Sequence, residues 1–585
     1  MICSQNSFSL VRIVTKNVMS LAVVVGCMLS LGCSPEVAAD DWPMWRSDAG
    51  HTAAVDGSLP EKLVPSWVRT YSPRIQVWDD PLNHDLMQYD RIFEPVVKDG
   101  RMFVNFNDAD KIVALDTKTG KELWTFYTDG PVRFPAVAWQ DCVLFVSDDG
   151  FLYAVNAKDG SLKWNFQGAP SSQKAIGNMR MISAWPARGG PVVEDGTVYF
   201  SASIWPFMGT FLYALDADSG EVQWVNDSTS AQYIKQPHSA PSFAGVAPQG
   251  TMTIVGDRLI VPGGRSIPAS FDRHSGEFQY FDINSGGKGN GGSFVVGLGN
   301  EYYVHTRERG VRSFNAADGV KTAFMINEPV LTDSKIYSAE MTEPAKGSKE
   351  KPQPVIKAYN SDKSLSWKLV GVDGRGDLIK VGKYLYAAGG GKLSAVKIYG
   401  SWFAGKVAWT VDIPEDVVRL IAADNQLFAV TLDGQILAFA GPETASPKHW
   451  KAETAPLPQD DAADQLPATL ANFIDSDLGY ALWFGLDDEA PLRSFINQTK
   501  LQIVVVDEDR DAVDRFRRTV DAAGEYGRRI SAHVGSISSF QAPPYVCRLV
   551  VLSPQVASQA TPGLNNWPKR IDRFGPAGKP GGNHG

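Results

Sequence analysis

One short pattern recurs along this 585-residue chain and constrains its fold more than any other feature. The pattern is a small residue, an Asp or Asn two positions later, a tight turn that contains Gly, and a Trp four positions after that Gly. The clearest copies read "ALDTKTGKELW", "AVNAKDGSLKW" and "ALDADSGEVQW", and their turns and aromatic positions are Gly120, Trp124, Gly160, Trp164, Gly220 and Trp224. Weaker copies follow, two of which end at Trp367 and Trp409.

This repeat predicts a β-propeller. Segments such as "LYALD" alternate apolar and polar residues, as half-buried strands do. The turn Gly can adopt the left-handed conformation that most other residues avoid, and the Trp is large enough to fill the gap between neighbouring units. Copies begin near residues 112, 152, 212, 270, 311, 355, 393 and 435, a spacing typical of propeller blades. We therefore predict an all-β, eight-bladed β-propeller over residues 41–445.

The two ends of the repeat region predict how the ring closes. The last copy, "QILAFAGPE", has no Trp of its own, whereas "LVPSWVRTY" near the N-terminus has Trp67 without a preceding copy. Together they make one complete unit. We expect the N-terminal strand to pair with the last blade, so that the ring has no exposed sheet edge.

Residues 1–39 read as a signal peptide. Arg12 and Lys16 precede an apolar run that is short for a membrane span of ~20 residues. Cleavage before Asp40 and lipoprotein processing, with lipidation of Cys27 or Cys33, remain open, as does an uncleaved anchor helix. Each cleavage alternative exports the protein, either free in the periplasm or anchored to a membrane.

The overall composition restricts the class of partner and the cysteine chemistry. A net charge of −9 and a pI near 5.5 give no basic surface for nucleic acid. After cleavage at Asp40 only Cys142 and Cys547 remain. They are too few and too far apart in the sequence to predict a disulfide scaffold or a cysteine metal site.

The repeat resembles that of pyrroloquinoline-quinone (PQQ)-type propellers, and "DDWPMWRSDAGHT" resembles the segment that often precedes it. Two classes share this repeat: quinoprotein alcohol and glucose dehydrogenases, and non-enzymatic propellers such as the lipoprotein of the outer-membrane barrel-assembly machinery. The first class implies PQQ stacked between a Trp and an adjacent Cys-Cys disulfide, with a calcium ion held by Glu, Asn and Asp oxygens. This sequence has no Cys-Cys pair, and we expect acidic turns such as "SDDG" (147–150) to be solvated.

Two long connections between copies are candidates for a ligand or partner site, because loops at one end of a propeller commonly form its binding surface. They span 173–190 and 231–250. The predicted ligand-binding residues in and near them are Arg180, Trp185, Arg188, His238 and Arg265. The alternative is that these are ordinary loop residues whose polar groups bind backbone carbonyls.

Beyond the repeats, residues 446–470 read as a linker, 471–556 as a small, incomplete α/β Rossmann-like domain, and 557–585 as a flexible tail. Strands and helices alternate in this domain, which indicates a parallel sheet. It resembles the first half of a class I S-adenosylmethionine-dependent methyltransferase. The resemblance assigns cofactor contacts to Asp507, at the end of the second strand, and to Gly485, which lacks the usual Gly-x-Gly. An exported protein would rarely meet this cytoplasmic cofactor.

Three functions therefore stand in order. The favoured hypothesis is an exported scaffold or binding propeller without a cofactor, whose loops contact a protein, glycan or small molecule. The second is a PQQ- and calcium-dependent oxidoreductase of alcohols or sugars. The third is a methyltransferase.

Overall fold

The computed structural model of the chain describes residues 41–74, 89–235, 240–264, 266–281, 290–306, 310–400, 403–442, 446–451, 454–458 and 478–559. The chain divides into two compact units, 1–36 and 37–585, and only the second contains described residues. The predicted signal peptide, with Cys27 and Cys33, lies outside them, as do most of the predicted linker and tail. Among the described helices, none is long and apolar enough to cross a membrane.

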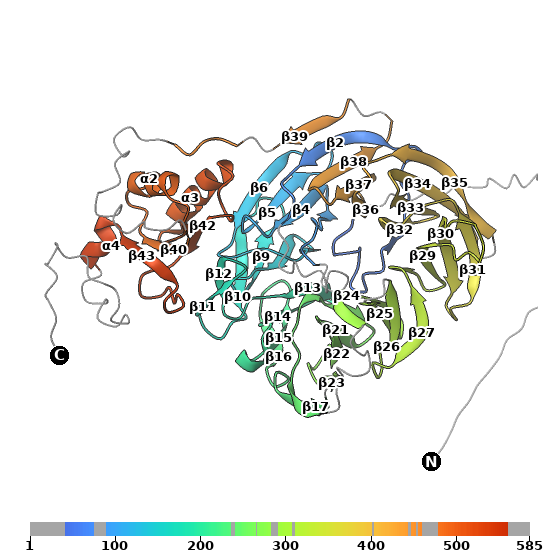
Figure 1. The fold of residues 1–585 in the computed structure, drawn as a ribbon, viewed down its shortest axis with the longest axis horizontal. Helices are drawn as coiled ribbons and strands as arrows, with labels where there is room; N and C mark the ends of the chain where they lie inside the picture. The colour runs from blue at the N-terminus through green and yellow to red at the C-terminus, as the bar shows by residue number, and fades with distance from the viewer. Residues whose placement is uncertain are drawn as a thin grey trace, which may run out of the picture. The chain divides into compact units, whose positions relative to one another are not determined.

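Eight sheets of four or five strands follow one another around a central axis (Figure 1). Their strands pair antiparallel, except that β1, β19 and β39 each add to one sheet in parallel. The predicted eight-bladed propeller is therefore confirmed. Blades 1 to 4 contain β3 (Val96–Lys98), β4 (Arg101–Phe106), β5 (Lys111–Asp116) and β6 (Glu122–Tyr127); β7 (Val137–Trp139), β8 (Cys142–Val146), β9 (Phe151–Asn156) and β10 (Leu162–Gln167); β13 (Gly189–Glu194), β14 (Thr197–Ala202), β15 (Phe211–Asp216) and β16 (Val222–Asn226), joined by β19 (Gly250–Thr251); and β20 (Thr253–Val255), β21 (Arg258–Gly263), β22 (Ser266–Asp272) and β23 (Phe278–Tyr280).

Blades 5 to 8 follow the same order from the axis outward. They contain β24 (Asn290–Leu298), β25 (Glu301–Thr306), β26 (Val311–Asn315) and β27 (Lys321–Ile326); β28 (Val330–Leu331), β29 (Lys335–Met341), β30 (Pro354–Asn360) and β31 (Leu365–Val370); β32 (Asp377–Val381), β33 (Tyr384–Gly389), β34 (Lys392–Tyr399) and β35 (Phe403–Asp412), joined by β1 (Ala54–Val55); and β36 (Val417–Ala423), β37 (Gln426–Thr431) and β38 (Gln435–Ala440), joined by β2 (Val64–Thr70) and β39 (Lys448–Lys451).

The ring closes as the sequence predicts. Strand β2 pairs antiparallel with β38, and Trp67 lies opposite Ala438. The first strand of ordinary length in the chain is thus the fourth strand of the last blade. Trp67 is fully buried, and its indole N–H donates to the carbonyl of Thr117 in blade 1 over 2.7 Å.

The repeat residues form the contact between neighbouring blades. In each strong copy the Gly has a φ of 69–75°, and a Cβ built on it would lie 2.7–2.8 Å from the ring of the Trp in the preceding blade. Trp67 covers Gly120, Trp124 covers Gly160 and Trp164 covers Gly220; Trp224 covers Gly276 in the same way. The turn Gly therefore meets two requirements at once: a left-handed backbone and a bare surface for the indole.

The segment that precedes the repeats, residues 41–55, lines the inside of the ring and is called the lead-in here. It hydrogen-bonds to the innermost strands of six blades, through backbone pairs that join Trp42 to Val97, Pro43 to Ala138, Ala49 to Ile254, Gly50 to Gly297, Thr52 to Leu331, and Ala53 to Lys380. Four of its non-glycine residues have positive φ, namely Arg46, Ser47, His51 and Ala53. The backbone of the lead-in is thus strained at these four residues and is held by its hydrogen bonds to the blades. It places Trp45 and Arg46 toward the axis.

Two hairpins are inserted between blades. β11 (Lys174–Gly177) and β12 (Arg180–Ser183) connect blades 2 and 3, while β17 (Gln232–Lys235) and β18 (Pro241–Ala244) follow blade 3. A short 3-10 helix, η1 (Pro206–Met208), joins β14 to β15. In an antiparallel meander, fourth-to-first and second-to-third connections emerge at the same end, so all three insertions lie at one end of the propeller.

The C-terminal described residues form a parallel sheet in the order β42-β41-β40-β43 with three helices along its course. Its elements are β40 (Tyr480–Phe484), α2 (Ala490–Gln498), β41 (Gln502–Asp507), α3 (Arg510–Ala522), β42 (Ile530–Val534), β43 (Cys547–Leu552) and α4 (Pro554–Gln559). The sheet is not separated from the propeller, because one hydrophobic cluster runs through both. Helix α3 contributes the fully buried Arg517, which pairs with Asp129 of the propeller at 2.5 Å.

Candidate functional site

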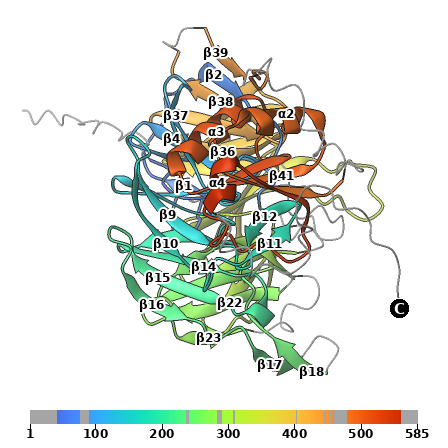
Figure 2. The same cartoon turned by 90° about the vertical axis from the view of Figure 1, so that its left-hand side faces the viewer.

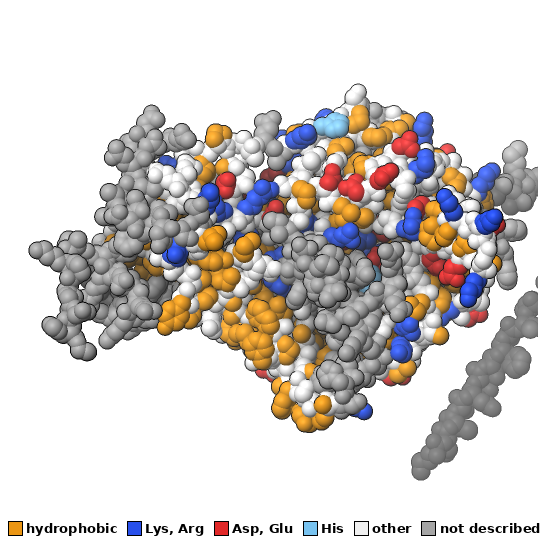
Figure 3. All heavy atoms as spheres, in the orientation of Figure 1, with side chains coloured by type: hydrophobic (Ala, Val, Ile, Leu, Met, Phe, Trp, Pro, Cys, Tyr) orange, Lys and Arg blue, Asp and Glu red, His pale blue; other side chains and the backbone are white. Residues whose placement is uncertain are grey.

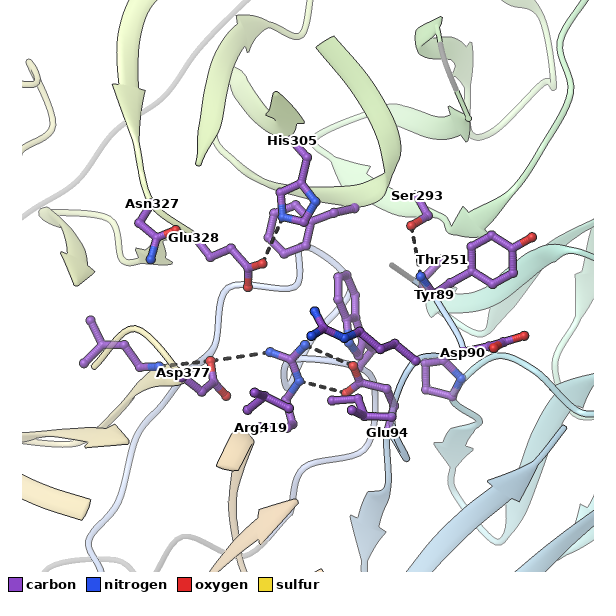
Figure 4. Close-up of a pocket in the computed structure, with 18 of the residues that line it drawn as sticks. Tyr89, Asp90, Glu94, Thr251, Ser293, His305, Asn327, Glu328, Asp377 and Arg419 are labelled. Atoms are coloured by element: carbon purple, nitrogen blue, oxygen red, sulfur yellow. Dashed lines mark hydrogen bonds and ion pairs between the residues drawn. The ribbon is translucent and has the colours of Figure 1, made fainter. Parts of the chain in front are cut away.

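A cavity of about 380 Å³ occupies the channel of the propeller (Figure 4). Part of its lining comes from Thr251 in β19 and from His305, Thr306 and Gly310 at the second-to-third connection of blade 5. The rest comes from the lead-in and from the residues that precede or begin the innermost strands of blades 1, 2, 5, 6, 7 and 8. These fourth-to-first connections are the same kind as those that carry the inserted hairpins, so the cavity opens at the end of the propeller where the hairpins lie. We call it the channel cavity.

Arg419 lies between two carboxylates on one side of the channel cavity. Its Nε and Nη2 atoms donate to the carboxylate of Glu94 at 2.8 and 3.0 Å, and Nη1 approaches Asp377 at 3.4 Å (Figure 4). Asp377 also accepts backbone N–H bonds from Leu378 and Leu420, at 2.9 and 2.7 Å. The three charged groups come from blades 8, 1 and 7 and hold one another in fixed orientations.

A second cluster of charged side chains faces Arg419, and it includes Arg46 of the strained lead-in. The carboxylate of Glu328 accepts from Nε2 of His305 at 2.9 Å and lies 3.8 Å from Nη1 of Arg46, which is equally far from Asp377. The imidazole of His305 stacks on Phe294, with ring centroids 4.4 Å apart. Arg46 is buried. Through its contacts with Glu328 and Asp377 it links the lead-in to the carboxylates of blades 6 and 7.

These contacts shift several pKa values. Burial raises the pKa of Glu94 and of Asp377 and lowers that of Arg46, against the attraction of their partners. For Glu328 burial acts upward, but the hydrogen bond from His305 and the nearby guanidinium groups outweigh it and lower its pKa to about 2. The most exposed of these carboxylates, Glu328, therefore stays ionised.

A third charged cluster lies beside the channel cavity. Asp148 accepts from Arg133 at 2.6 Å and from two nitrogens of Arg188 at 2.8 and 2.9 Å, and Arg133 also pairs with Asp90 at 2.6 Å. The expectation that the "SDDG" turn is solvated is wrong, because Asp148 and Asp149 are only 1% and 4% exposed. Their burial is possible because arginines from neighbouring connections neutralise Asp148.

The three predicted ligand-binding residues that the structure describes lie in different contacts. Arg188 is buried against Asp148 beside the cavity, while Arg180 donates to Asp110 and to the carbonyl of Asp108 in blade 1. Trp185 donates its indole N–H to the carbonyl of Met208 at 2.8 Å and so connects the inserted loop to η1. None of these three lines the channel cavity. The remaining two, His238 and Arg265, lie outside the described residues.

The predicted cofactor residues of the C-terminal sheet are engaged with their own chain. The carboxylate of Asp507 accepts from the backbone N–H groups of Leu486 and Asp509, at 2.6 and 2.7 Å. Gly485 has a φ of 99°, and a Cβ built on it would lie 2.0 Å from Oγ of Ser553. The first loop of the sheet is therefore packed against the end of β43, and its backbone is hydrogen-bonded to the carboxylate that the resemblance assigns to the cofactor.

Sequence reasoning missed the residues of the channel cavity because it aligned the outer turns of the repeat. A second pattern precedes the innermost strands: a charged residue, then Pro within three positions, then aliphatic residues. It reads "EPVV" from Glu94, "RFPAV" from Arg133, "RGGPVV" from Arg188 and "EPVL" from Glu328. This pattern identifies Glu94, Arg133 and Glu328 of the lining, but not Asp377 or Arg419, which no Pro follows in this way.

The donors in the channel cavity do not fit a quinone–calcium centre of the kind that the resemblance implies. A calcium ion needs several free oxygen ligands. Here Glu94, Glu328 and Asp377 each face a guanidinium or an imidazole, and a cation among them would lie beside Arg46 and Arg419. Among the described residues, no group of three or more His, Cys, Asp or Glu side chains is arranged to hold a metal ion.

Comparison with known proteins gives partial matches. A family model described as outer membrane protein assembly factor BamB matches residues 65–185. A 142-residue stretch, 22% of this chain, is 30% identical to the dehydrogenase subunit of the quinone alcohol dehydrogenase of Gluconobacter oxydans, and a 135-residue stretch is 30% identical to the serine/threonine-protein kinase AfsK of Streptomyces griseus. These stretches cover 18% and 15% of the two relatives, less than a fifth of their length.

Among solved structures, the quinohemoprotein alcohol dehydrogenase of Comamonas testosteroni aligns over 72% of this chain and 84% of its own. The sequence identity is 14% and the TM-score 0.45. By its own sheet order the chain is an eight-bladed propeller, and the stretch that matches the BamB family model comprises β2 of the last blade, blades 1 and 2, and the hairpin that follows them.

Proposed function

We propose that the chain is a binding propeller whose channel cavity takes a small polar molecule. The observation that carries the proposal is the ordered ring of charged side chains around the cavity, above all Arg419 between Glu94 and Asp377. The cavity volume falls in the range of ligand sites, and polar groups held in fixed orientations bind a ligand with a small entropic cost.

The same end of the propeller is proposed as the surface that meets a larger partner. Its insertions expose large apolar side chains, and β17 and β18 project beyond the blades (Figure 2). Hydrophobic side chains gather over this part of the ring (Figure 3). The most exposed of them, 64–84%, are Met179, Phe207, Tyr233 and Phe243. Exposed apolar groups at this density are typical of interaction surfaces.

Export is part of the proposal. It rests on the apolar N-terminal run and on the match to a family model described as an outer membrane assembly factor. Fractionation of cells that express the full chain, with and without Cys27→Ser and Cys33→Ser, tests it. We expect the mature protein outside the cytoplasm, and a cytoplasmic full-length product would contradict export.

A screen of polar small molecules tests the binding proposal. Thermal shift of the full chain identifies binders, and calorimetry then compares each one on Glu328→Gln and on the control Asp412→Asn, whose carboxylate is 90% exposed at the outside of blade 7. We expect binders that Glu328→Gln weakens and Asp412→Asn leaves unchanged. Binders that respond to neither change would contradict a site in the channel cavity.

A quinoprotein oxidoreductase is the second candidate. It is favoured by the 142-residue alignment with a quinone alcohol dehydrogenase subunit and opposed by the paired carboxylates of the channel cavity. Reduction of a dye by the chain loaded with PQQ and calcium, with an alcohol or a sugar as substrate, would support it. We do not propose methyl transfer, because the carboxylate of Asp507 accepts two N–H bonds from its own chain.

A further inference from the structure

The charges of the channel cavity also define the chemical class of its ligand. We propose that it is a neutral, polyhydroxylated molecule, that is, a saccharide or another polyol. This inference rests on the proposed function and adds a ligand class to it.

The first step is the charge balance of the lining. Four carboxylates are matched by four guanidinium groups, so the lining has no formal net charge. The carboxylates are Asp90, Glu94, Glu328 and Asp377, and the guanidinium groups are Arg91, Arg133, Arg375 and Arg419. Most of these groups are already paired: Arg419 with Glu94 and Asp377, Arg133 with Asp90, and Arg375 with Asp373. A charged ligand would compete with these pairs and must also lose its hydration on entering.

The second step is the cost of making room for a charge. A carboxylate ligand would have to displace Glu94 from Arg419, where two short bonds of 2.8 and 3.0 Å already join the groups. A cationic ligand would have to lie beside the same guanidinium. Breaking a buried pair leaves an uncompensated charge and is strongly unfavourable.

The third step is the hydrogen-bonding capacity that the ion pairs leave. A carboxylate can accept about four hydrogen bonds and a guanidinium can donate five. Arg419 makes three, and Glu328 receives one from His305 while its side chain stays 29% exposed. A hydroxyl both donates and accepts, so neighbouring hydroxyls can use the spare positions without breaking a pair.

The fourth step is the apolar part of the lining. Trp45, Tyr89 and Phe134 bring aromatic rings to the same cavity, and Tyr89 stacks on Phe134 with centroids 5.0 Å apart. A saccharide has C–H surfaces for such rings as well as hydroxyls for the charged groups. A cavity that offers both therefore fits a polyol better than a purely ionic ligand.

Calorimetric titration of the full chain tests the ligand class with four probes of defined charge: trehalose (neutral), glycine betaine (zwitterionic), citrate (anionic) and spermidine (cationic). We expect trehalose to bind and the three charged probes not to bind. In Glu328→Gln the affinity for trehalose should fall at least fivefold, because an ionised acceptor makes stronger hydrogen bonds than an amide.

Two further variants guard against a folding effect of Glu328→Gln. Thr251→Val removes one hydroxyl from the lining at constant shape and should lower the affinity for trehalose about threefold. Asp412→Asn should leave this affinity unchanged. If a charged probe bound, and Glu328→Gln lowered the affinity for it, the proposed ligand class would be wrong and the proposed function would still hold. If neither these probes nor the broader screen gave binding that depends on the cavity variants, both proposals would fall.

Discussion

Replacing Gly120 by Ala tests whether the repeat glycine is required for the contact between blades or only for the turn. Its φ of 69° costs an alanine about 1–2 kcal/mol. The new Cβ would also lie 2.7 Å from the ring of Trp67, which is fully buried between blades 8 and 1. Overpacking of this kind costs about 1–3 kcal/mol, so we expect a total loss of about 2–5 kcal/mol.

Gly299 provides the matched control. Its φ is 65°, and a Cβ there has no heavy atom within 4 Å. Gly299→Ala should therefore cost only the backbone part, about 1–2 kcal/mol. Equilibrium unfolding in urea, followed by tryptophan fluorescence, compares the two variants. In a Trp67→Leu background the extra cost of Gly120→Ala should shrink toward that of the control. Equal losses for Gly120→Ala and Gly299→Ala would refute the role of the indole contact.

The remaining predictions concern buried charges. Burial lowers the pKa of His51 and of His533 to about 3; because only the unfolded state then takes up protons below pH 6.5, stability should fall with pH by about 2 kcal/mol per histidine at pH 5. Asp149, whose pKa burial raises to about 6, acts in the opposite direction, as do Glu94 and Asp377, whose pKa values burial also raises, so the test is the difference between two chains. From pH 7 to pH 5 the free energy of unfolding in urea should fall by about 2 kcal/mol more in the unaltered chain than in His533→Gln, and equal changes in the two chains would contradict the reasoning. Arg517→Met removes the guanidinium that pairs with Asp129 and Asp514, so we expect faster hydrogen exchange in 502–552 than in the blades and a loss of about 3–5 kcal/mol. Arg528→Met, at an exposed hydrogen bond to the propeller, is the control and should leave that exchange unchanged.

The ring could be predicted from sequence because the repeat encodes it locally. Each copy contains its own alternation of apolar and polar residues, its turn Gly and its Trp. These residues alone determine the third strand and the fourth strand of a blade and its contact with the next blade. Ring closure followed from one missing Trp at the end and one unmatched Trp at the start. Both signals lie within a few residues of the structures that they describe.

The channel cavity could not be predicted in this way. Glu94, Asp377 and Arg419 are separated by up to 325 residues in sequence and meet only when the ring closes. The prediction that the "SDDG" turn is solvated was wrong for the same reason. The burial of Asp148 depends on Arg133 and Arg188, which come from other connections. The local sequence of an acidic turn predicts that it is exposed to solvent. The arginines that neutralise its charge are close to it only in the folded chain.

Calorimetric titration of the full chain with PQQ, with and without calcium, tests the central claim most directly. The claim is that the channel holds a charge-balanced binding cavity rather than a quinone centre. We predict no calcium-dependent heat at high concentrations of PQQ, because Glu94, Glu328 and Asp377 are already paired. Tight binding of PQQ that requires calcium, and that Glu328→Gln abolishes, would contradict the claim and assign the cavity to oxidation chemistry.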